Sequence, residues 1–405
     1  MPYDVASVRA QVPALLEGAA HFDGPGGTQT PAVVAQAVAD TLTAAIANRG
    51  TVTVAEQRAE AVVHDARAAM GDLLRLDPSG IVFGRSATEL TFQLARTLAT
   101  EWGPGDEVVV SRLDHDANVR PWVIAAEQAG ASVRWVGFDP ATGELTAADV
   151  AAVVGPHTRL VALTAASNLI GTRPDLPAVA DVVHTAGAQF YVDGVHATAH
   201  VATDVPASGA DFWVCSPYKF LGPHLGVLGA RPETLEPLRP AKLLPSSDAV
   251  PERFELGTLP YELLAGTTAA VEFLAGLDRA ATGDRRARLE QSYAALEAHE
   301  DELLGWLEPR LRALPGITVH SNAARRTPTL LFTMAGHAPQ DVRIALADKG
   351  INAPAGHFYA WETSHHLGLG STGGVRIGLA PYTDHTDVAR LVEALTEVTS
   401  AGGNT

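Results

Sequence analysis

Between residues 81 and 229 the chain alternates short apolar runs with longer alanine-rich stretches that also carry polar residues. Short apolar runs between turn residues predict buried strands, and the alanine-rich stretches predict helices. The predicted strands are residues 81–83, 107–111, 132–136, 160–164, 189–193, 212–215 and 226–228. Strands that alternate with helices are typical of a mostly parallel sheet between two layers of helices, so we predict an α/β fold.

The pattern changes after residue 261. A helical stretch covers residues 262–277, and a long polar helix follows at 285–314, with a kink expected at Pro309. The rest has the mixed pattern of a smaller α+β domain, with strands at 317–320, 329–333 and 374–378 and helices at 341–349 and 386–399. We therefore predict four parts, which are an N-terminal segment (1–20), a large domain (21–283), a small C-terminal domain (284–400) and a disordered tail (401–405).

Composition narrows the classes of function. The apolar share of 46% allows a sizeable core, while the net charge of -17 argues against a nucleic-acid partner or an anionic membrane surface. The sequence shows neither a signal-peptide pattern nor an apolar run long enough to span a bilayer, so we expect a cytoplasmic protein. The single cysteine, Cys215, excludes an intramolecular disulfide and a multi-cysteine metal site, and we expect no metal.

Two strand-end residues suggest the chemistry. Lys219 closely follows the apolar run 212–215, where burial would lower the pKa of its amine and favour Schiff-base formation. Asp193 ends the run 189–193. Pyridoxal phosphate needs such a pair, because a lysine binds its aldehyde and an acid keeps its ring nitrogen protonated. Either residue alone has a simpler interpretation, as a surface lysine or a helix cap, but the pair predicts a cofactor site.

Other polar residues follow the predicted strands at the edge of the sheet where ligands gather. Residues 84–89 lead from a strand into a helix and offer backbone N–H groups and hydroxyls to a phosphate. His115 offers a flat ring that can cover a cofactor, and Asn168 offers an amide to a phenolate oxygen. Each also has an ordinary alternative, which is a helix cap, a backbone-bonded histidine or a turn residue.

Together these stretches resemble the class V aminotransferase group of fold-type I pyridoxal-phosphate enzymes, and within it the cysteine desulfurase-like proteins. The resemblance extends from HFDGPGGTQ at residues 21–29 to VRIGLAPY at residues 375–382. It implies the fold of a pyridoxal-phosphate-dependent transferase and a homodimer that acts on a small-molecule amino acid.

The resemblance also implies roles for individual residues. Lys219 would carry the Schiff base, Asp193 would pair with the ring nitrogen, and His115 would lie on the ring. Asn168 and His196 would lie near the ring oxygen. The phosphate would be held by Ala87, Thr88, Ser216 and Tyr218, and by Thr258 of the neighbouring subunit. The substrate would be bound by Gly26, Gly27 and Arg376, whose guanidinium favours a two-point pair with the α-carboxylate.

This chain departs from the desulfurase pattern at two places. Where desulfurases carry a loop cysteine that attacks the substrate sulfur, this sequence has Tyr359, and Pro354 replaces a preceding arginine. A tyrosine cannot accept a persulfide, and Cys215 lies inside a predicted strand. Tyr359 and His357 are candidate catalytic acids or substrate contacts, with a packed aromatic beside a turn as the alternative. His196 stands where many desulfurases have glutamine and where epimerase-like and kynureninase-like relatives have histidine.

We therefore predict a pyridoxal-phosphate-dependent lyase or transferase that acts on an α-amino acid, with Lys219 as the general base at Cα. The leading reaction is β- or γ-elimination that cleaves a carbon–sulfur bond without a persulfide cysteine. Epimerisation, carbon–carbon bond formation or cleavage, and amino transfer are the alternatives. A scaffold that binds the cofactor without catalysis is the non-enzymatic alternative, but it would need none of this set of residues.

Overall fold

The central sheet confirms the predicted α/β architecture. The structure, a computed structural model, describes residues 3–402. Seven strands lie in the order β2-β8-β7-β6-β5-β3-β4. The strands from β7 to β4 pair in parallel, whereas β8 pairs antiparallel with both of its neighbours, β7 and β2. They are β2 (Ile81–Gly84), β3 (Glu107–Ser111), β4 (Ser132–Val136), β5 (Thr158–Thr164), β6 (Gln189–Asp193), β7 (Phe212–Cys215) and β8 (Gly226–Ala230). All seven apolar runs therefore form strands of one sheet.

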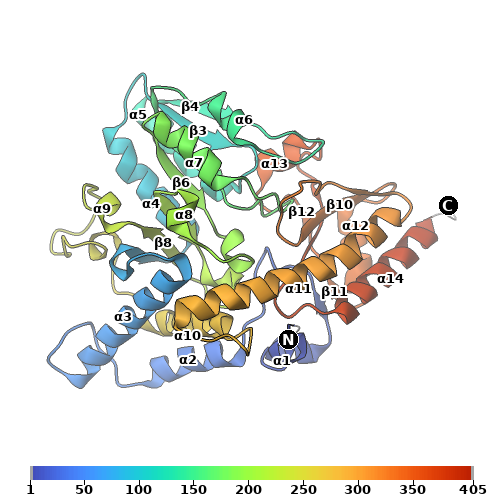
Figure 1. Cartoon of the computed structure of the whole chain (residues 1–405), viewed down its shortest axis with the longest axis horizontal. Coiled ribbons are helices and arrows are strands. Elements are labelled where there is room, and N and C mark those ends of the chain that lie inside the picture. The colour runs from blue at the N-terminus through green and yellow to red at the C-terminus, as the bar shows by residue number, and fades with distance from the viewer. Residues whose placement is uncertain (1–2, 403–405) are drawn as a thin grey trace.

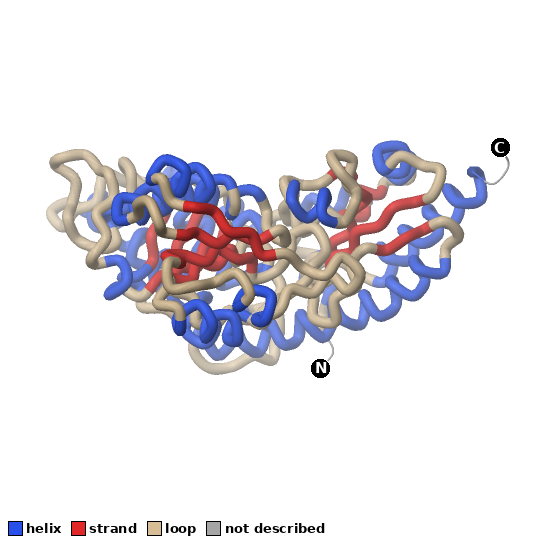
Figure 2. Tube along the Cα trace, turned by 90° about the horizontal axis from the view of Figure 1, so that it is seen from above, coloured by secondary structure: helices blue, strands red, loops and turns tan. Residues whose placement is uncertain are grey.

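Both faces of this sheet are buried, because neighbouring residues of a strand point to opposite sides. Val108 and Val110 pack in one hydrophobic cluster with α4 (Ala87–Leu98) and α5 (Arg120–Ala129). Val109, between them, packs in another cluster with α7 (Leu176–Thr185). Figure 2 shows the strands enclosed by helices. Double burial explains why the strands are continuous apolar runs in the sequence.

Several further helices cover the central sheet or extend from it (Figure 1). Near the sheet lie α6 (Ala147–Ala151), α8 (Val205–Ser208) and α9 (Pro232–Leu235). A group packed together is formed by α2 (Ala32–Thr43), α3 (Val54–Leu74) and α10 (Tyr261–Ala275). No helix in residues 3–402 combines the length and apolar character needed to cross a bilayer.

The C-terminal part is built on a separate antiparallel sheet in the order β12-β13-β10-β9. Its strands are β9 (Ile317–Val319), β10 (Thr329–Met334), β12 (Ala355–Gly356) and β13 (Gly374–Gly378). Its helices are α11 (Arg285–Ala313), α12 (Pro339–Ala347), α13 (Trp361–His366) and α14 (His385–Gly402). The three predicted strands and both predicted helices are present, and α11 continues through Pro309 as one helix.

Two details differ from the expected division of the chain. The strand β1 (Ala20–His21) pairs in parallel with β11 (Ile351–Asn352), and Phe22 packs among residues of the C-terminal part. The segment at residues 20–22 thus packs on the C-terminal part. A strand of two residues is too short to be recognised from the sequence pattern. In the segment expected as a disordered tail, α14 includes residues 401 and 402, while 403–405 lie outside the described residues.

Candidate active site

A cavity of about 700 Å³ opens at the carboxyl ends of the parallel strands. Thr164 and Asp193 end β5 and β6, and Ser216 follows β7. Most of the predicted site residues line this one cavity, namely Gly26, Ala87, Thr88, His115, Asn168, Asp193, His196, Ser216, Tyr218, Lys219, Tyr359 and Arg376. Residues from both ends of the chain are therefore brought together at the predicted edge of the sheet.

Three predicted site residues lie outside the cavity lining. Gly27 has a φ of +154° and packs so closely on Tyr218 that an added Cβ would lie 3.3 Å from its ring. His357 packs edge-on against Trp361, with ring centroids 5.3 Å apart. Thr258 lines a separate hollow beside α4 and α10. None of these three residues therefore lines the cavity.

Lys219 lies in the 3-10 helix η6 (Pro217–Lys219), which begins just after β7. Its Nζ donates a hydrogen bond to the carbonyl oxygen of Pro25 and lies 4.7 Å from the centre of the Tyr218 ring. Burial, assisted by the charge of Arg376, lowers the pKa of the amine to about 7, while Asp23 and Asp193 oppose the shift. The amine is therefore partly unprotonated at neutral pH, as a nucleophile requires.

Asp193 is buried at the end of β6 and accepts a hydrogen bond of 2.9 Å from the Val195 N–H. Burial raises the pKa of its carboxyl to about 6, while the Val195 N–H and Lys219 limit that rise. Above this pH the carboxylate is ionised and can hold a proton on an adjacent basic nitrogen.

His115 has its tautomer determined by the backbone. Its Nδ1 accepts a hydrogen bond of 3.0 Å from the Ala117 N–H, so a neutral ring carries its proton on Nε2. Burial lowers the pKa of this imidazole to about 4, helped by the charges of Lys219 and Arg376. His115 is thus an uncharged flat ring at neutral pH, suited to lie against a cofactor.

Arg376, on β13, is almost completely buried. Its Nη2 is 2.6 Å from Oδ1 of Asp23, its Nη1 donates to the carbonyl oxygen of Asn168 at 3.0 Å, and its guanidinium lies 3.8 Å from the centre of the Phe358 ring. Its Nε has no partner among the described residues. The guanidinium is therefore fixed in position and retains donor capacity for an anion.

The loop at the cavity mouth is anchored at several points. Phe358 and Tyr359 both have left-handed backbone conformations, with φ of +51° and +59°. The Asn168 amide donates to the Phe358 carbonyl oxygen at 2.9 Å, and the Asp116 N–H donates to that of Tyr359 at 2.8 Å. The Tyr359 side chain is 69% exposed and its ring lies 5.4 Å from that of His115. Such backbone costs about 1–3 kcal/mol per residue and persists where the surroundings enforce it.

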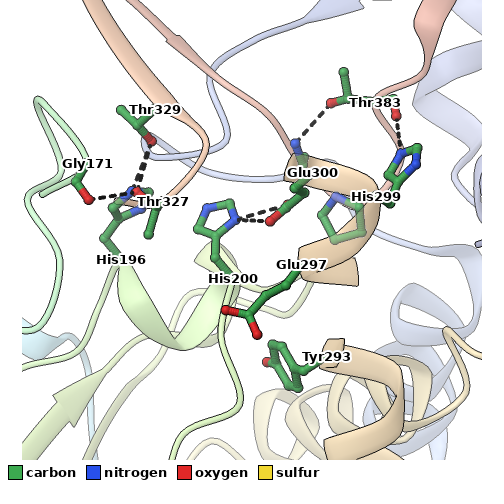
Figure 3. Close-up of polar contacts among 12 residues, drawn as sticks. Gly171, His196, His200, Tyr293, Glu297, His299, Glu300, Thr327, Thr329 and Thr383 are labelled. Atoms are coloured by element: carbon green, nitrogen blue, oxygen red, sulfur yellow. Dashed lines mark hydrogen bonds and ion pairs between the residues drawn. The ribbon is translucent and has the colours of Figure 1, made fainter. Parts of the chain in front are cut away.

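His196 lines the cavity and is almost fully buried (Figure 3). Its Nε2 lies 2.8 Å from the Thr327 hydroxyl and 3.0 Å from the Thr329 hydroxyl. Burial and the neighbouring His200 hold the pKa of this imidazole well below its ordinary value, so His196 is neutral.

The site has the features that pyridoxal phosphate requires. The first residues of α4, Ala87 and Thr88, have backbone N–H groups without intrahelical partners, which suit a phosphate. An added Cβ on Gly226 would lie 2.3 Å from the Ser86 backbone, so glycine is needed for this close packing. The buried Oδ1 of Asn168 also has no partner among the described residues. These residues, with Lys219 and Asp193, fit the cofactor.

Sequence reasoning missed two acidic residues of the site. Asp23 lies in the stretch 21–29 but was given no role, and it is the partner of Arg376. Asp114 is buried beside His115, where it bonds to the Ser111 hydroxyl and the Asn118 amide, and burial raises the pKa of its carboxyl to about 8. The sequence places Asp114 next to His115, but its burial is not visible in a local pattern.

Comparisons with known proteins agree with this site. The chain is 35% identical to an uncharacterised protein of Mycobacterium tuberculosis, over 98% of this chain and 99% of that protein. It is 30% identical to a probable cysteine desulfurase of Mycolicibacterium paratuberculosis, over 99% of this chain and 59% of that protein. The crystal structure of a cysteine desulfurase of Escherichia coli superposes with a TM-score of 0.87 and 28% identity, covering 99% of this chain and all of that one.

The family profile described as Aminotransferase class-V matches residues 20–391. The match includes the ends of both sheets and every residue of the cavity. The chain is therefore a pyridoxal-phosphate-dependent enzyme with the fold-type I architecture, and it belongs to the class V aminotransferase family.

Proposed function

We propose that this enzyme cleaves a carbon–sulfur bond in a cysteine-derived amino acid by β- or γ-elimination, without passing the sulfur through a protein cysteine. The observation that carries the proposal is the position of Cys215. It is the only cysteine of the chain, and it is completely buried in β7, where burial raises the pKa of its thiol. The loop over the cavity presents Tyr359 instead.

When bound, pyridoxal phosphate supplies an aldehyde that reacts with amines and a ring that withdraws electrons from the substrate Cα. Lys219 would hold the cofactor through that aldehyde, and its Nζ would serve as the general base for the proton on the substrate Cα. Asp193 would keep a proton on the ring nitrogen, and the neutral imidazole of His115 would pack against the ring. The N–H groups of Ala87 and Thr88 would hold the phosphate, together with Ser216 and Tyr218.

Arg376 binds the α-carboxylate of the substrate. A guanidinium held by Asp23 and by the Asn168 carbonyl is already oriented, so little freedom is lost when a carboxylate binds. Gly26 lies next to this pair, and an added Cβ there would lie 2.4 Å from the Asp23 carboxylate. Tyr359 and His357 are then left as the candidate contacts for the substrate side chain at the mouth of the cavity.

We also propose that the protein is a cytoplasmic homodimer. Each of its active sites would contain residues of both subunits. Thr258 lies outside the cavity of its own subunit, which supports a contact with the phosphate of the neighbouring one. Exposed apolar side chains near α2, α3 and Thr258 offer a surface on which a second subunit could pack, namely Leu42, Val52, Val54 and Leu256. Mixing Lys219→Ala subunits with subunits that carry a Thr258 change should alter the activity expected of independent sites. A fully active monomer in sedimentation would contradict the dimer.

The reaction is tested with a panel of amino acids, followed by cofactor absorbance and by mass spectrometry of the products. From a cysteine-derived substrate we expect sulfide or a small thiol together with a keto acid and ammonia. Turnover should survive Cys215→Ser, and intact-protein mass should show no added sulfur after incubation with cysteine. A stoichiometric one-sulfur adduct on Cys215 that turnover requires would overturn the proposal. If only a sulfur-free amino acid reacts, the reaction is one of the alternatives that the same fold supports.

A further inference from the structure

A buried histidine–glutamate pair, formed by His200 and Glu300, lies next to His196 (Figure 3). His200 follows the 3-10 helix η5 (Ala197–Ala199), and Glu300 lies in the middle of α11. Nδ1 of His200 is 3.0 and 3.1 Å from the two carboxylate oxygens of Glu300. Both residues are only 2% exposed.

A buried histidine–glutamate pair is energetically unfavourable compared with apolar side chains in the same place. Moving ionisable groups out of water costs several kcal/mol per charge, and apolar side chains of similar volume often stabilise a protein more. The hydrophobic core of the large part of the chain consists mainly of leucine, valine and alanine. Stability alone therefore does not account for His200 and Glu300.

The pair contacts the active site through the packing of the His200 ring against the His196 ring. The rings of His200 and His196 have centroids 4.9 Å apart and planes at 72°, so one ring presents its edge to the other. His196 in turn lines the cavity and is bound at Nε2 by two threonine hydroxyls of the C-terminal part. The His196 imidazole is thus restrained by the threonines at one atom and by His200 against its ring.

Glu300 is the only polar restraint on His200 among the described side chains. Nε2 of His200 is buried and has no hydrogen-bond partner in this part of the chain, so the orientation of the ring depends on the contact at Nδ1. Removing the carboxylate would leave both ring nitrogens without a partner and free the ring to turn. Any such turn would change the packing against His196.

We propose that Glu300, acting through His200, is a positioning residue that holds His196 in place against the bound cofactor. This inference rests on the proposed placement of the cofactor among His196, Lys219 and Asp193. It assigns a role in the active site to α11, a helix that contributes no residue to the cavity lining.

The test compares variants of the full-length protein by two readouts that do not depend on turnover. These are the dissociation constant of pyridoxal phosphate and the absorbance maximum of the bound cofactor. Glu300→Leu should weaken cofactor binding about tenfold, as loss of a group that orients a functional histidine does, and shift the absorbance maximum. Glu300→Gln retains an oxygen that accepts from Nδ1, so it should restore most of both values.

Glu297→Leu is the matched control. Glu297 lies one turn earlier on α11 and pairs with Arg173 at 3.2 Å, and it makes no hydrogen bond or ion pair with His200, so neither readout should change. The thermal unfolding midpoint, measured alongside, separates positioning from loss of folding. If Glu300→Leu does not fold, His200→Phe removes the same link while keeping a ring, and it should reproduce the weaker binding and the shifted absorbance.

The decisive measurement places Glu300→Leu in a His196→Ala background. If Glu300 acts through His196, the substitution should there change cofactor affinity by less than about twofold, because coupled residues are not additive. An unchanged affinity and spectrum in Glu300→Leu, or the full tenfold effect without His196, would overturn the proposal. A parent protein that binds pyridoxal phosphate but cleaves no carbon–sulfur bond would defeat only the proposed reaction and leave this test valid.

Discussion

Lys219 and Arg376 are two buried basic side chains of one cavity, but Lys219 contacts uncharged groups whereas Arg376 contacts a carboxylate. Lys219, at the end of the parallel sheet, contacts a neutral carbonyl and the face of a tyrosine. Arg376, on the antiparallel sheet, contacts the Asp23 carboxylate. Burial lowers the pKa of both groups, yet only the lysine approaches neutrality, at about 7.

The difference follows from the chemistry of the two side chains. An amine is a strongly hydrated point charge that loses its proton when burial removes water, whereas a guanidinium stays protonated in proteins. The same low-dielectric cavity can therefore hold a reactive neutral amine and a permanent positive charge. One serves covalent chemistry, and the other serves recognition of a carboxylate.

The largest effect is expected at the amine. Lys219→Ala should abolish the cofactor that borohydride traps on the protein, because no other amine lies in the cavity. The chain has only two other lysines, Lys242 and Lys349, and both pair with acids elsewhere. Peptide mapping after reduction checks this, with Lys242→Ala as the control. A reduced pyridoxyl group retained by Lys219→Ala would invalidate the assignment.

The next effect is expected at the guanidinium. Arg376→Lys should weaken amino-acid binding by about 1–3 kcal/mol, the scale of a charge-assisted hydrogen bond, and leave cofactor content unchanged. Titration of the substrate by cofactor absorbance measures the loss. Arg112→Lys is a control, since Arg112 pairs with Glu362 outside the cavity lining. An unaltered titration in Arg376→Lys would assign the carboxylate to another residue.

The two cations should also be linked through pH. The pKa of Lys219 is lowered in the folded protein, so the amine is protonated below about pH 7 and neutral above it. Uptake of pyridoxal phosphate by the cofactor-free protein should therefore speed up as pH rises through about 7. Arg376→Gln should move this midpoint upward, because it removes a positive charge and frees Asp23. A midpoint unmoved by the substitution would mean that the two groups do not interact.

The smallest effect is expected at Cys215, which neither cation contacts. Cys215→Ser buries a hydroxyl in place of a thiol and should cost at most about 1–3 kcal/mol of stability. Thermal unfolding measures the cost, and the turnover assay should show activity close to that of the parent protein. A variant that folds normally but has lost turnover would give the thiol a direct role in the chemistry.

Much of the site was visible in the sequence because strand-end residues are encoded locally. The apolar runs 189–193 and 212–215 predicted where Asp193 and Lys219 would lie, and both line the cavity. The prediction was less complete where a partner comes from a distant element. Thr258 was predicted from resemblance and His357 from its place in the loop over the cavity, and neither lines the cavity.

The sequence by itself determined the layered architecture and the cofactor class. The alternation of apolar runs with helical stretches, and the lysine and aspartate that follow two of these runs, can be recognised in short stretches of sequence. Only the tertiary structure decided which charges meet. Asp23 reaches Arg376 across 353 positions, and Glu300 reaches His200 across 100. The pKa of Lys219 is likewise a tertiary property, because desolvation depends on everything packed around the amine and no local pattern of residues records it.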